Sequence, residues 1–271
     1  MKFRFARLCR SKTRASPASP SPLEVNAELS QWLGSPFGSH VRALELQALE
    51  ALLPDTAGYR GMALQVVENS PVLDGAPQLH KFAMASCSQQ SVAAISDFYA
   101  LPLPSSVVDM VVLDHVLDYC ELPHESLKEA ARVVLPSGHL IIVGFNPVSG
   151  FGLARWLMTC FSRRLIWRCR GLSVPRILDW LRLVGFQCEK VVYGAYNMPV
   201  QSRRFLSRMT FVEEGAKKLH LPLGTFYVIV AKKQRLRPIT GRRDWLAKAI
   251  KPVTLIPDSK IEPTKNGARD G

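Results

Sequence analysis

The stretch that decides the fold runs from residue 107 to residue 147, and it opens with VVDMVVLDHVLDY at 107–119. Its β-branched and apolar run at 108–113 suits a strand that is buried on both faces. Apolar residues at helical spacing follow, between Pro123 and the Pro-Ser-Gly sequence at 136–138. A second buried run, LIIV at 140–143, comes next. The order predicts a parallel strand–helix–strand unit with a right-handed connection.

The rest of the chain predicts one folded domain between two basic tails. With 271 residues and 47% hydrophobic content, the chain can bury one sizeable core. A tail at 1–22 is expected because its Ser/Pro-rich end has few large apolar groups to offset the entropy of ordering. The folded domain is expected at 23–232, with leading helices near 23–33 and 41–53, and a second basic tail at 233–271.

The formal net charge of +13 favours an acidic partner such as nucleic acid, anionic lipid or a phosphorylated substrate. The alternative is that the excess charge lies in solvated tails, where many of the lysines and arginines occur. No zinc-finger spacing or aromatic RNA-recognition signature is present. Charge alone therefore leaves nucleic acid open as a partner.

The N-terminal residues and the cysteines predict the compartment and the absence of a metal site. Residues 1–14 alternate basic and apolar residues without a continuous apolar core, which favours a cytoplasmic protein over an exported one. The six cysteines show no CxxC pair and no histidine at metal-ligand spacing, so we expect free thiols and no metal site.

Two motifs carry a resemblance to a known family. The sequence LPLPSSVVDMVVLDHVLDY at 101–119, with LKEAARVVLPSGHLIIVGFNP at 127–147, resembles the second half of the class I S-adenosylmethionine-dependent methyltransferase domain. The likeness is closest to the methyltransferase type 11 group and covers roughly residues 60–232. It implies an α/β fold with a seven-stranded Rossmann-like sheet in the order 3-2-1-4-5-7-6. Strand seven would be antiparallel, helices would cover both faces, and S-adenosyl-L-methionine would be the cofactor.

The resemblance places the cofactor loop after a first strand at 62–67, because ligands of open α/β sheets bind beyond the carboxyl ends of strands. In the family this loop is an acidic-x-Gly-x-Gly-x-Gly run, in which glycines let the backbone approach the ligand. Here Gln65 stands at the acidic position, while Val67, Asn69 and Pro71 stand at the glycine positions. The implied loop contacts are Gln65, Val67, Glu68 and Asn69.

Further cofactor contacts are implied at the ends of the other strands. After a second strand at 79–84 the family places a carboxylate for the ribose hydroxyls, but residues 85–88 contain no Asp or Glu. Asp97 matches the position that accepts from the adenine amino group, and Phe98 would lie against the ring. The alternative for Asp97 is a turn or helix-cap carboxylate. At the end of the fourth strand, Leu113 and Asp114 complete the implied set.

His115 follows Asp114, where the resemblance implies a side chain that faces the sulfonium and the substrate. A histidine there is a candidate catalytic base because its ordinary pKa lies near neutrality. The alternative is a histidine that only hydrogen-bonds the loop.

The segment 151–171 departs most from the family. It interleaves large apolar residues, two tryptophans among them, with five arginines. A basic amphipathic helix with tryptophans is typical of an element that binds an anionic membrane surface. The alternative is an active-site lid packed on the sheet with its arginines in water.

Two hypotheses for function follow. The first is S-adenosylmethionine-dependent methyl transfer to a small-molecule acceptor, in which positioning supplies most of the rate enhancement. The second is a non-catalytic protein with the methyltransferase fold that binds an anionic partner, either a membrane surface or nucleic acid.

Overall fold

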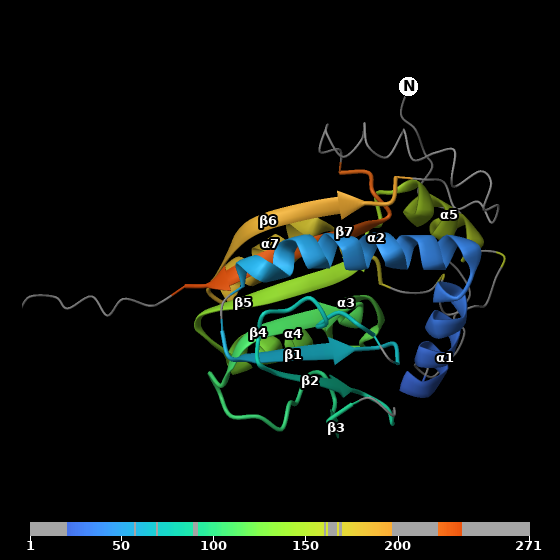
Figure 1. The fold of residues 1–271 in the computed structure, drawn as a ribbon. Coiled ribbons are helices and arrows are strands. Elements are labelled where there is room, and N and C mark those ends of the chain that lie inside the picture. Colours follow the sequence, from blue (N-terminus) through green and yellow to red (C-terminus); the bar gives the residue numbers. More distant parts are fainter. Residues whose placement is uncertain are drawn as a thin grey trace, which may run out of the picture. The chain divides into compact units, whose positions relative to one another are not determined.

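The computed structural model describes residues 21–56, 58–68, 70–88, 92–159, 161, 167, 170–196 and 222–234 (Figure 1). Its strands form one seven-stranded sheet in the order β3-β2-β1-β4-β5-β7-β6. The strands are β1 Arg60–Gln65, β2 His80–Ala85, β3 Ala94–Ile95, β4 Val108–Asp114, β5 Val134–Phe145, β6 Phe186–Gly194 and β7 Phe226–Lys233. The strands from β3 to β5 in this order pair in parallel, and β7 pairs antiparallel with both β5 and β6. The predicted fold class, strand order and antiparallel seventh strand are therefore confirmed.

The central strands β4 and β5 are buried over most of their length because both of their faces are covered. In β4 the residues from Met110 to Asp114 are all buried, as are those of β5 from His139 to Phe145. β1 ends at Gln65, two residues before the predicted end of the first strand, so Val66 and Val67 belong to the loop that follows. This boundary matters because that loop lies at the ligand edge of the sheet.

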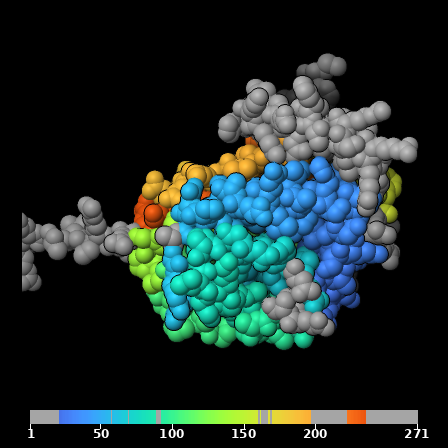
Figure 2. Space-filling view, in the orientation of Figure 1, coloured from blue at the N-terminus to red at the C-terminus, as the bar shows by residue number. Residues whose placement is uncertain are grey.

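Helices cover both faces, as the resemblance implied. In Figure 1, α2 (Pro36–Leu52) crosses in front of the sheet, while α4 (Pro123–Val133) and α7 (Val174–Leu183) lie behind it. α1 (Pro22–Leu33), the short α3 (Val116–Tyr119) and α5 (Gly150–Met158) lie toward the carboxyl ends of β1 and β4. A single 3-10 turn, η1 (Leu53–Asp55), follows α2. In the space-filling view of Figure 2, the atoms of α1 and α2 form a continuous blue surface on the side facing the reader.

The Pro-Ser-Gly sequence at 136–138 does not end the fourth helix as the sequence suggested. α4 stops at Val133, and the chain enters β5 directly at Val134. Ser137 has a φ of 71°, and the β4–β5 register shifts between Val108 and Met110. The turn residues thus form a bulge-like irregularity near the start of β5. β5 has extra residues there relative to β4, and the two strands pair again from Met110 and His139 onward.

The two predicted leading helices are present, and a glycine sets the angle between them. Ser21 caps α1 in a capping box with Glu24, and the Ser35 side chain caps α2 by accepting from the Gly38 amide. A Cβ at Gly38 would lie 2.1 Å from the Trp32 carbonyl oxygen at the end of α1. Only glycine permits this close approach of one helix to the backbone of the other.

The predicted tails at 1–22 and 233–271 fall almost entirely outside the described residues. The few tail residues that the structure describes extend the folded domain slightly. Pro22 already belongs to α1, and β7 continues to Lys233.

We expect Gly38→Ala to lower the free energy of unfolding by about 1–3 kcal/mol or more, because the added methyl group meets backbone atoms that cannot move aside. Gly150→Ala is the matched control, since a Cβ there has no atom within 4 Å. Chemical denaturation of both variants measures the difference. Equal stability of the two variants would contradict the account of this helix junction.

Candidate functional site

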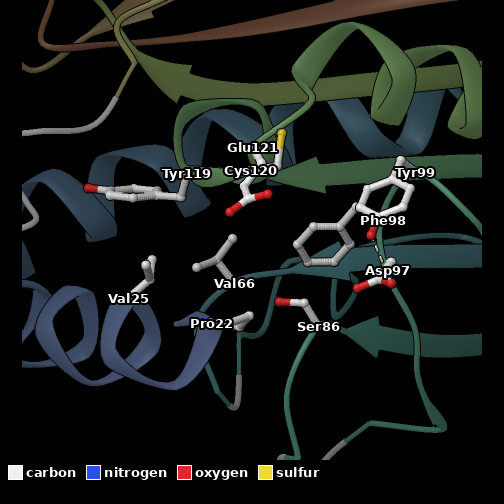
Figure 3. Close-up of a pocket in the computed structure, with 10 residues that line it drawn as sticks. All are labelled: Pro22, Val25, Val66, Ser86, Asp97, Phe98, Tyr99, Tyr119, Cys120 and Glu121. Atoms are coloured by element: carbon white, nitrogen blue, oxygen red, sulfur yellow. Dashed lines mark hydrogen bonds between the residues drawn. The ribbon is translucent and has the colours of Figure 1, made fainter. Parts of the chain in front are cut away.

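A cavity of about 240 Å³ lies at the carboxyl ends of β1, β2 and β4, beneath α1 (Figure 3). Its walls come from α1, the loops after β1, β2 and β3, and the segment at the end of α3. The lining residues are Pro22, Val25, Val66, Ser86, Asp97, Phe98, Tyr99, Tyr119, Cys120 and Glu121. This is the edge at which parallel α/β sheets bind their ligands.

Asp97 and Phe98 both line the cavity, at the place where the resemblance implied an adenine site. Phe98 is buried with 6% of its surface exposed, whereas Asp97 is exposed. The Tyr99 hydroxyl donates to Asp97 Oδ2 at 3.1 Å, and this bond raises the pKa of Tyr99. Asp97 therefore presents an accepting carboxylate beside a flat apolar ring, an arrangement that suits an aromatic ligand bearing an amino group.

Glu121 is the functional candidate that sequence reasoning missed. Figure 3 shows its carboxylate pointing into the cavity from the segment after α3. Ser86 lines the opposite wall, just after β2, where the sequence has no acidic residue. No sequence signal marked Glu121, because the family places its ribose carboxylate after the second strand and this residue follows the fourth. Two carboxylates and a hydroxyl thus face the same space.

Cys120 also lines the cavity, but its thiol is not prepared to react. Burial raises the pKa of Cys120 to about 11, with the Ser126 side chain opposing the shift. The thiol stays protonated at neutral pH, and a protonated thiol is a poor nucleophile. Its contribution to the cavity is an apolar wall.

α1 is attached to the first loop by a side-chain contact. The Glu68 backbone amide donates to Asn26 Oδ1 at 3.3 Å, and Asn26 also accepts from Ser30 at 3.1 Å. Val67 is buried next to Glu68, which is half-buried. The contact places α1 over the loop that would otherwise be open to water.

The remaining implied contacts lie deeper, and one of them falls outside the described residues. Gln65 and Leu113 are buried in β1 and β4, and Gln65 is the register partner of Asp114. None of these three lines the cavity. Asn69 lies outside the described part of the chain. Of the implied contacts, Asp97 and Phe98 line the cavity, whereas Gln65, Val67, Glu68, Leu113 and Asp114 do not. Val66, which was not among them, lines it in place of Val67.

Asp114 is fully buried and is held by Arg42 of α2. The guanidinium donates to both carboxylate oxygens, from Nη1 to Oδ1 at 3.0 Å and from Nη2 to Oδ2 at 2.9 Å. The Ser70 hydroxyl adds a bond to Oδ2 at 2.6 Å. Burial opposes the charged form, but Arg42, His115 and Ser70 together hold the pKa of Asp114 below its ordinary value. Asp114 is therefore an ionised carboxylate with both oxygens engaged.

His115 is also fully buried, and carboxylates engage both of its ring nitrogens. Nε2 lies 3.3 Å from Glu45 of α2, and Nδ1 lies 3.2 Å from Asp118 Oδ2. Burial alone would lower its pKa, but Glu45 and Asp118 outweigh burial and raise it to about 10. The ring stacks on Phe145 with centroids 4.3 Å apart. The imidazole is thus protonated at neutral pH, which favours the interpretation of His115 as a structural side chain over that of a base.

We name these five side chains the buried ion cluster: Arg42, Glu45, Asp114, His115 and Asp118. The backbone makes it compact. His115 has a φ of 55° and a ψ of 12°, a left-handed conformation that non-glycine residues seldom adopt. This turn at the end of β4 lets Asp114 and His115 point to different partners, while Asp118 Oδ2 also accepts from the Phe145 amide at 2.8 Å.

The Gly-Phe-Asn-Pro sequence at 144–147 has a structural role. Asn146 Nδ2 donates to the carbonyls of Pro222 and Gly224, both at 2.9 Å, and this joins the end of β5 to the entry of β7. A Cβ at Gly144 would lie 2.5 Å from the Tyr227 hydroxyl oxygen. Asn146 also starts the turn into α5, where its carbonyl accepts from Ser149 at 2.7 Å. The motif fixes where α5 begins.

Comparison with known proteins agrees with this geometry. The family model described as a methyltransferase domain matches residues 58–142. The uncharacterized protein YafS of Escherichia coli K12 is 34% identical over 158 residues, which cover 57% of this chain and 60% of YafS. The match thus spans less than two thirds of that relative's length.

Solved structures share the fold at lower identity. A Thermotoga maritima structure titled as an S-adenosylmethionine-dependent methyltransferase, possible histamine N-methyltransferase, has a TM-score of 0.57 at 20% identity, covering 77% of this chain and 95% of its own. An Archaeoglobus fulgidus S-adenosylmethionine-dependent methyltransferase has a TM-score of 0.52 at 17% identity, covering 75% and 97%.

Residues 58–142 thus match the methyltransferase domain family, and the sheet has the class I methyltransferase fold. The family implies S-adenosylmethionine as the cofactor, and the cavity can be tested for its fit. Phe98, Val66 and Asp97 suit an adenine ring, and Ser86 and Glu121 suit ribose hydroxyls. The lining of this cavity is therefore chemically compatible with the adenosine part of that cofactor.

Two further features of the described residues bear on the early expectations. Cys87, Cys120 and Cys188 are free thiols, and within the described part of the chain no group of three His, Cys, Asp or Glu side chains could hold a metal ion. In the same residues no helix has the length and apolar character that a membrane span requires.

We expect Arg42→Met to lower the free energy of unfolding by about 3–5 kcal/mol, because it leaves Asp114 and Glu45 buried without their cation. Arg182→Met is the control. Arg182 pairs with Asp179 at the surface of α7, where such a pair contributes about 1 kcal/mol or less. Guanidinium chloride titrations at neutral pH compare the variants. A cost for Arg42→Met no larger than that for Arg182→Met would contradict the cluster's role.

His115 also predicts a pH dependence of stability. Its folded-state pKa, about 10, lies above the value near 6.5 that is ordinary for histidine. Its contribution to stability is therefore fully present below pH ~6.5 and is lost as pH rises through about 10. We expect the free energy of unfolding to fall more steeply over this window in the wild type than in His115→Gln. His124→Gln, at an exposed position, should follow the wild type. Parallel profiles for wild type and His115→Gln would refute the assignment.

Proposed function

We propose that the chain transfers a methyl group from S-adenosylmethionine to a small-molecule acceptor. The observation that carries the proposal is the cavity at the carboxyl ends of β1, β2 and β4, in which Asp97 and Phe98 lie together. Asp97 would accept from the adenine amino group, and Phe98 would lie against the ring. Glu121 and Ser86 would take the ribose hydroxyls in place of the carboxylate that is absent after β2.

The cofactor supplies an electrophilic methyl group on its sulfonium when bound. The chain's task is to hold the acceptor in line with that group and to exclude water, which requires no strong base. The buried ion cluster fits a chain whose task is positioning and not proton removal. Gln65 and Asp114 are side by side at the ends of β1 and β4, and Arg42 keeps Asp114 ionised and fixed in place. We assign His115 a positioning role, because it anchors α2 to the end of β4 through Glu45.

A specific observation favours a second candidate function. Both oxygens of Asp114 are already bonded to Arg42 and Ser70, and the first loop has Val67, Asn69 and Pro71 where the family has glycines. A chain built in this way has the fold and an adenosine-sized cavity, with the region next to Asp114 closed by its own side chains. The second candidate is a non-catalytic protein that binds an anionic partner, and it predicts no methyl transfer even where a nucleoside binds.

We expect Asp97→Asn to weaken S-adenosylhomocysteine binding by about tenfold or more, because it removes a charge-assisted hydrogen bond. Glu121→Gln should weaken it by a similar factor if this carboxylate takes the ribose hydroxyls. Isothermal titration calorimetry of the full chain measures both changes.

The control for both variants is Asp74→Asn, at an exposed residue outside the cavity lining, which should bind as the wild type does. Undiminished binding by Asp97→Asn would refute the adenine assignment. Wild-type binding without transfer of a radiolabelled methyl group to any acceptor in a cell extract would favour the second candidate. No wild-type binding at millimolar ligand would refute methyl transfer.

A further inference from the structure

α5 and the residues just before and after it carry a group of large apolar side chains in contact with water. We name this group the α5 face, and its members are Val148, Leu153, Trp156, Leu157, Met158 and Phe161. Trp156 is 68% exposed and Phe161 is 79% exposed. Soluble proteins expose single apolar residues commonly, but a contiguous set of this kind marks an interaction surface.

The inner face of the same helix explains why these side chains cannot turn inward. Phe151 is fully buried and packs against Trp32, Phe37 and Phe145, with ring centroids 5.3 to 5.8 Å apart. Arg155 is also buried on this side. Because Phe151 and Arg155 occupy the inward positions, helical geometry directs Leu153, Trp156 and Leu157 away from the sheet. The exposed face is thus a consequence of how α5 is anchored.

A hollow lies beside this face, at the start of α5. Its lining includes Pro147, Val148 and Leu153, and the indoles of Trp156 and Trp167 flank it. The hollow has a volume of about 620 Å³. A largely apolar hollow between two indoles suits an acyl chain or another flat or linear apolar group.

The sequence that contains α5 is basic. Between residues 131 and 178 the sequence contains no Asp or Glu, while it contains seven arginines. Two of them, Arg170 and Arg176, are exposed in the described part of the chain. Tryptophan side chains prefer the boundary between lipid and water, and arginines beside them bind anionic headgroups. The whole chain carries a net charge of +13, which acts in the same direction.

The α5 face also lies at the functional edge of the sheet. α5 follows β5 directly, and Figure 1 shows it on the same side as α1 and the carboxyl ends of β1 and β4. The same strand ends carry Asp114 and the cavity beneath α1. A surface that binds the α5 face would therefore meet the edge at which ligands enter.

We propose that the α5 face docks the protein on an anionic lipid bilayer, with the apolar side chains at the level of the acyl chains and the arginines on the headgroups. Trp156, Leu157 and Phe161 provide the buried apolar area, and the flanking arginines select anionic lipid. This docking does not depend on methyl transfer.

The test is co-sedimentation of the full chain, without cofactor, with vesicles of phosphatidylcholine alone or of phosphatidylcholine containing phosphatidylglycerol. We expect binding to the anionic vesicles that weakens as salt is raised, because the charge interaction is screened. The double variant Leu157→Ser/Phe161→Ser should bind about tenfold more weakly or worse. In the wild type, Trp156 fluorescence should shift to shorter wavelength on binding, and Trp156→Phe should lose most of that shift.

Leu79→Ser is the matched control. Leu79 is 84% exposed but precedes β2, at the amino ends of the strands, so its loss should leave vesicle binding unchanged. Equal partitioning to both vesicle types would overturn the proposal, as would an equal loss with Leu79→Ser. Analytical ultracentrifugation adds a third outcome: a dimer that the double variant dissociates would identify a second copy of the chain as the occupant. Failure here leaves the adenosine site untouched, since no cofactor is present in the test.

Discussion

The bidentate pair between Arg42 and Asp114 is the interaction on which the functional edge depends. Asp114 ends the central strand β4 and is fully buried, so without a cation it would be an isolated charge in the protein interior. Arg42 supplies that cation from α2, a helix that lies 72 residues earlier in the chain. The same arginine also contacts Glu45, which in turn contacts His115. One guanidinium thereby fixes the helix to the strand end, while Glu45 and Asp118 raise the pKa of the neighbouring histidine.

This arrangement divides the carboxyl edge of the sheet into two parts with different properties. The part beneath α1 is an open cavity with carboxylates and an aromatic ring at its walls. The part beneath α2 is closed, and hydrogen bonds and ion pairs join Arg42, Ser70 and Asp114, and His115 and Asp118. The methyltransferase fold with an altered first loop is therefore compatible with both an enzyme and a binding protein, because fold by itself does not settle activity. What separates them is whether the closed part can admit the remainder of the cofactor next to Asp114.

The sequence allowed the sheet to be predicted well and the site only in part. The apolar runs at 108–113 and 140–143 predict two buried strands, and the family resemblance carried by the motifs around them implies the strand order that the structure has. Asp97 and Phe98, which the resemblance implied as adenine contacts, both line the cavity, and their role there stays a prediction. The interpretation of His115 as a base considered only its ordinary pKa. It did not include Glu45, because this residue is far from His115 in the sequence and reaches the imidazole only when α2 packs on the sheet. Glu121 was missed for a related reason, since its position is set by the turn after β4 and no motif marks it.

Long-range contacts that the sequence does not show also decide which side chains of α5 are exposed. Its amphipathic pattern is visible in the sequence, but periodicity does not say which apolar side chains face the core. The contacts of Phe151 with Trp32 and Phe145 decide this, and they leave Trp156 outside. The inner face of the helix is packed on the core and the outer face is exposed, so the lid and the membrane-binding interpretations both stay predictions.

The central claim is that the cavity beneath α1 is an adenosine site next to an ion cluster that stays closed. A crystal structure of the full chain with S-adenosylhomocysteine tests it most directly. The account predicts the adenine ring against Phe98 with its amino group at Asp97, and the Arg42–Asp114 pair intact beside it. An adenine bound elsewhere, or a ligand that displaces Arg42 from Asp114, would contradict the account.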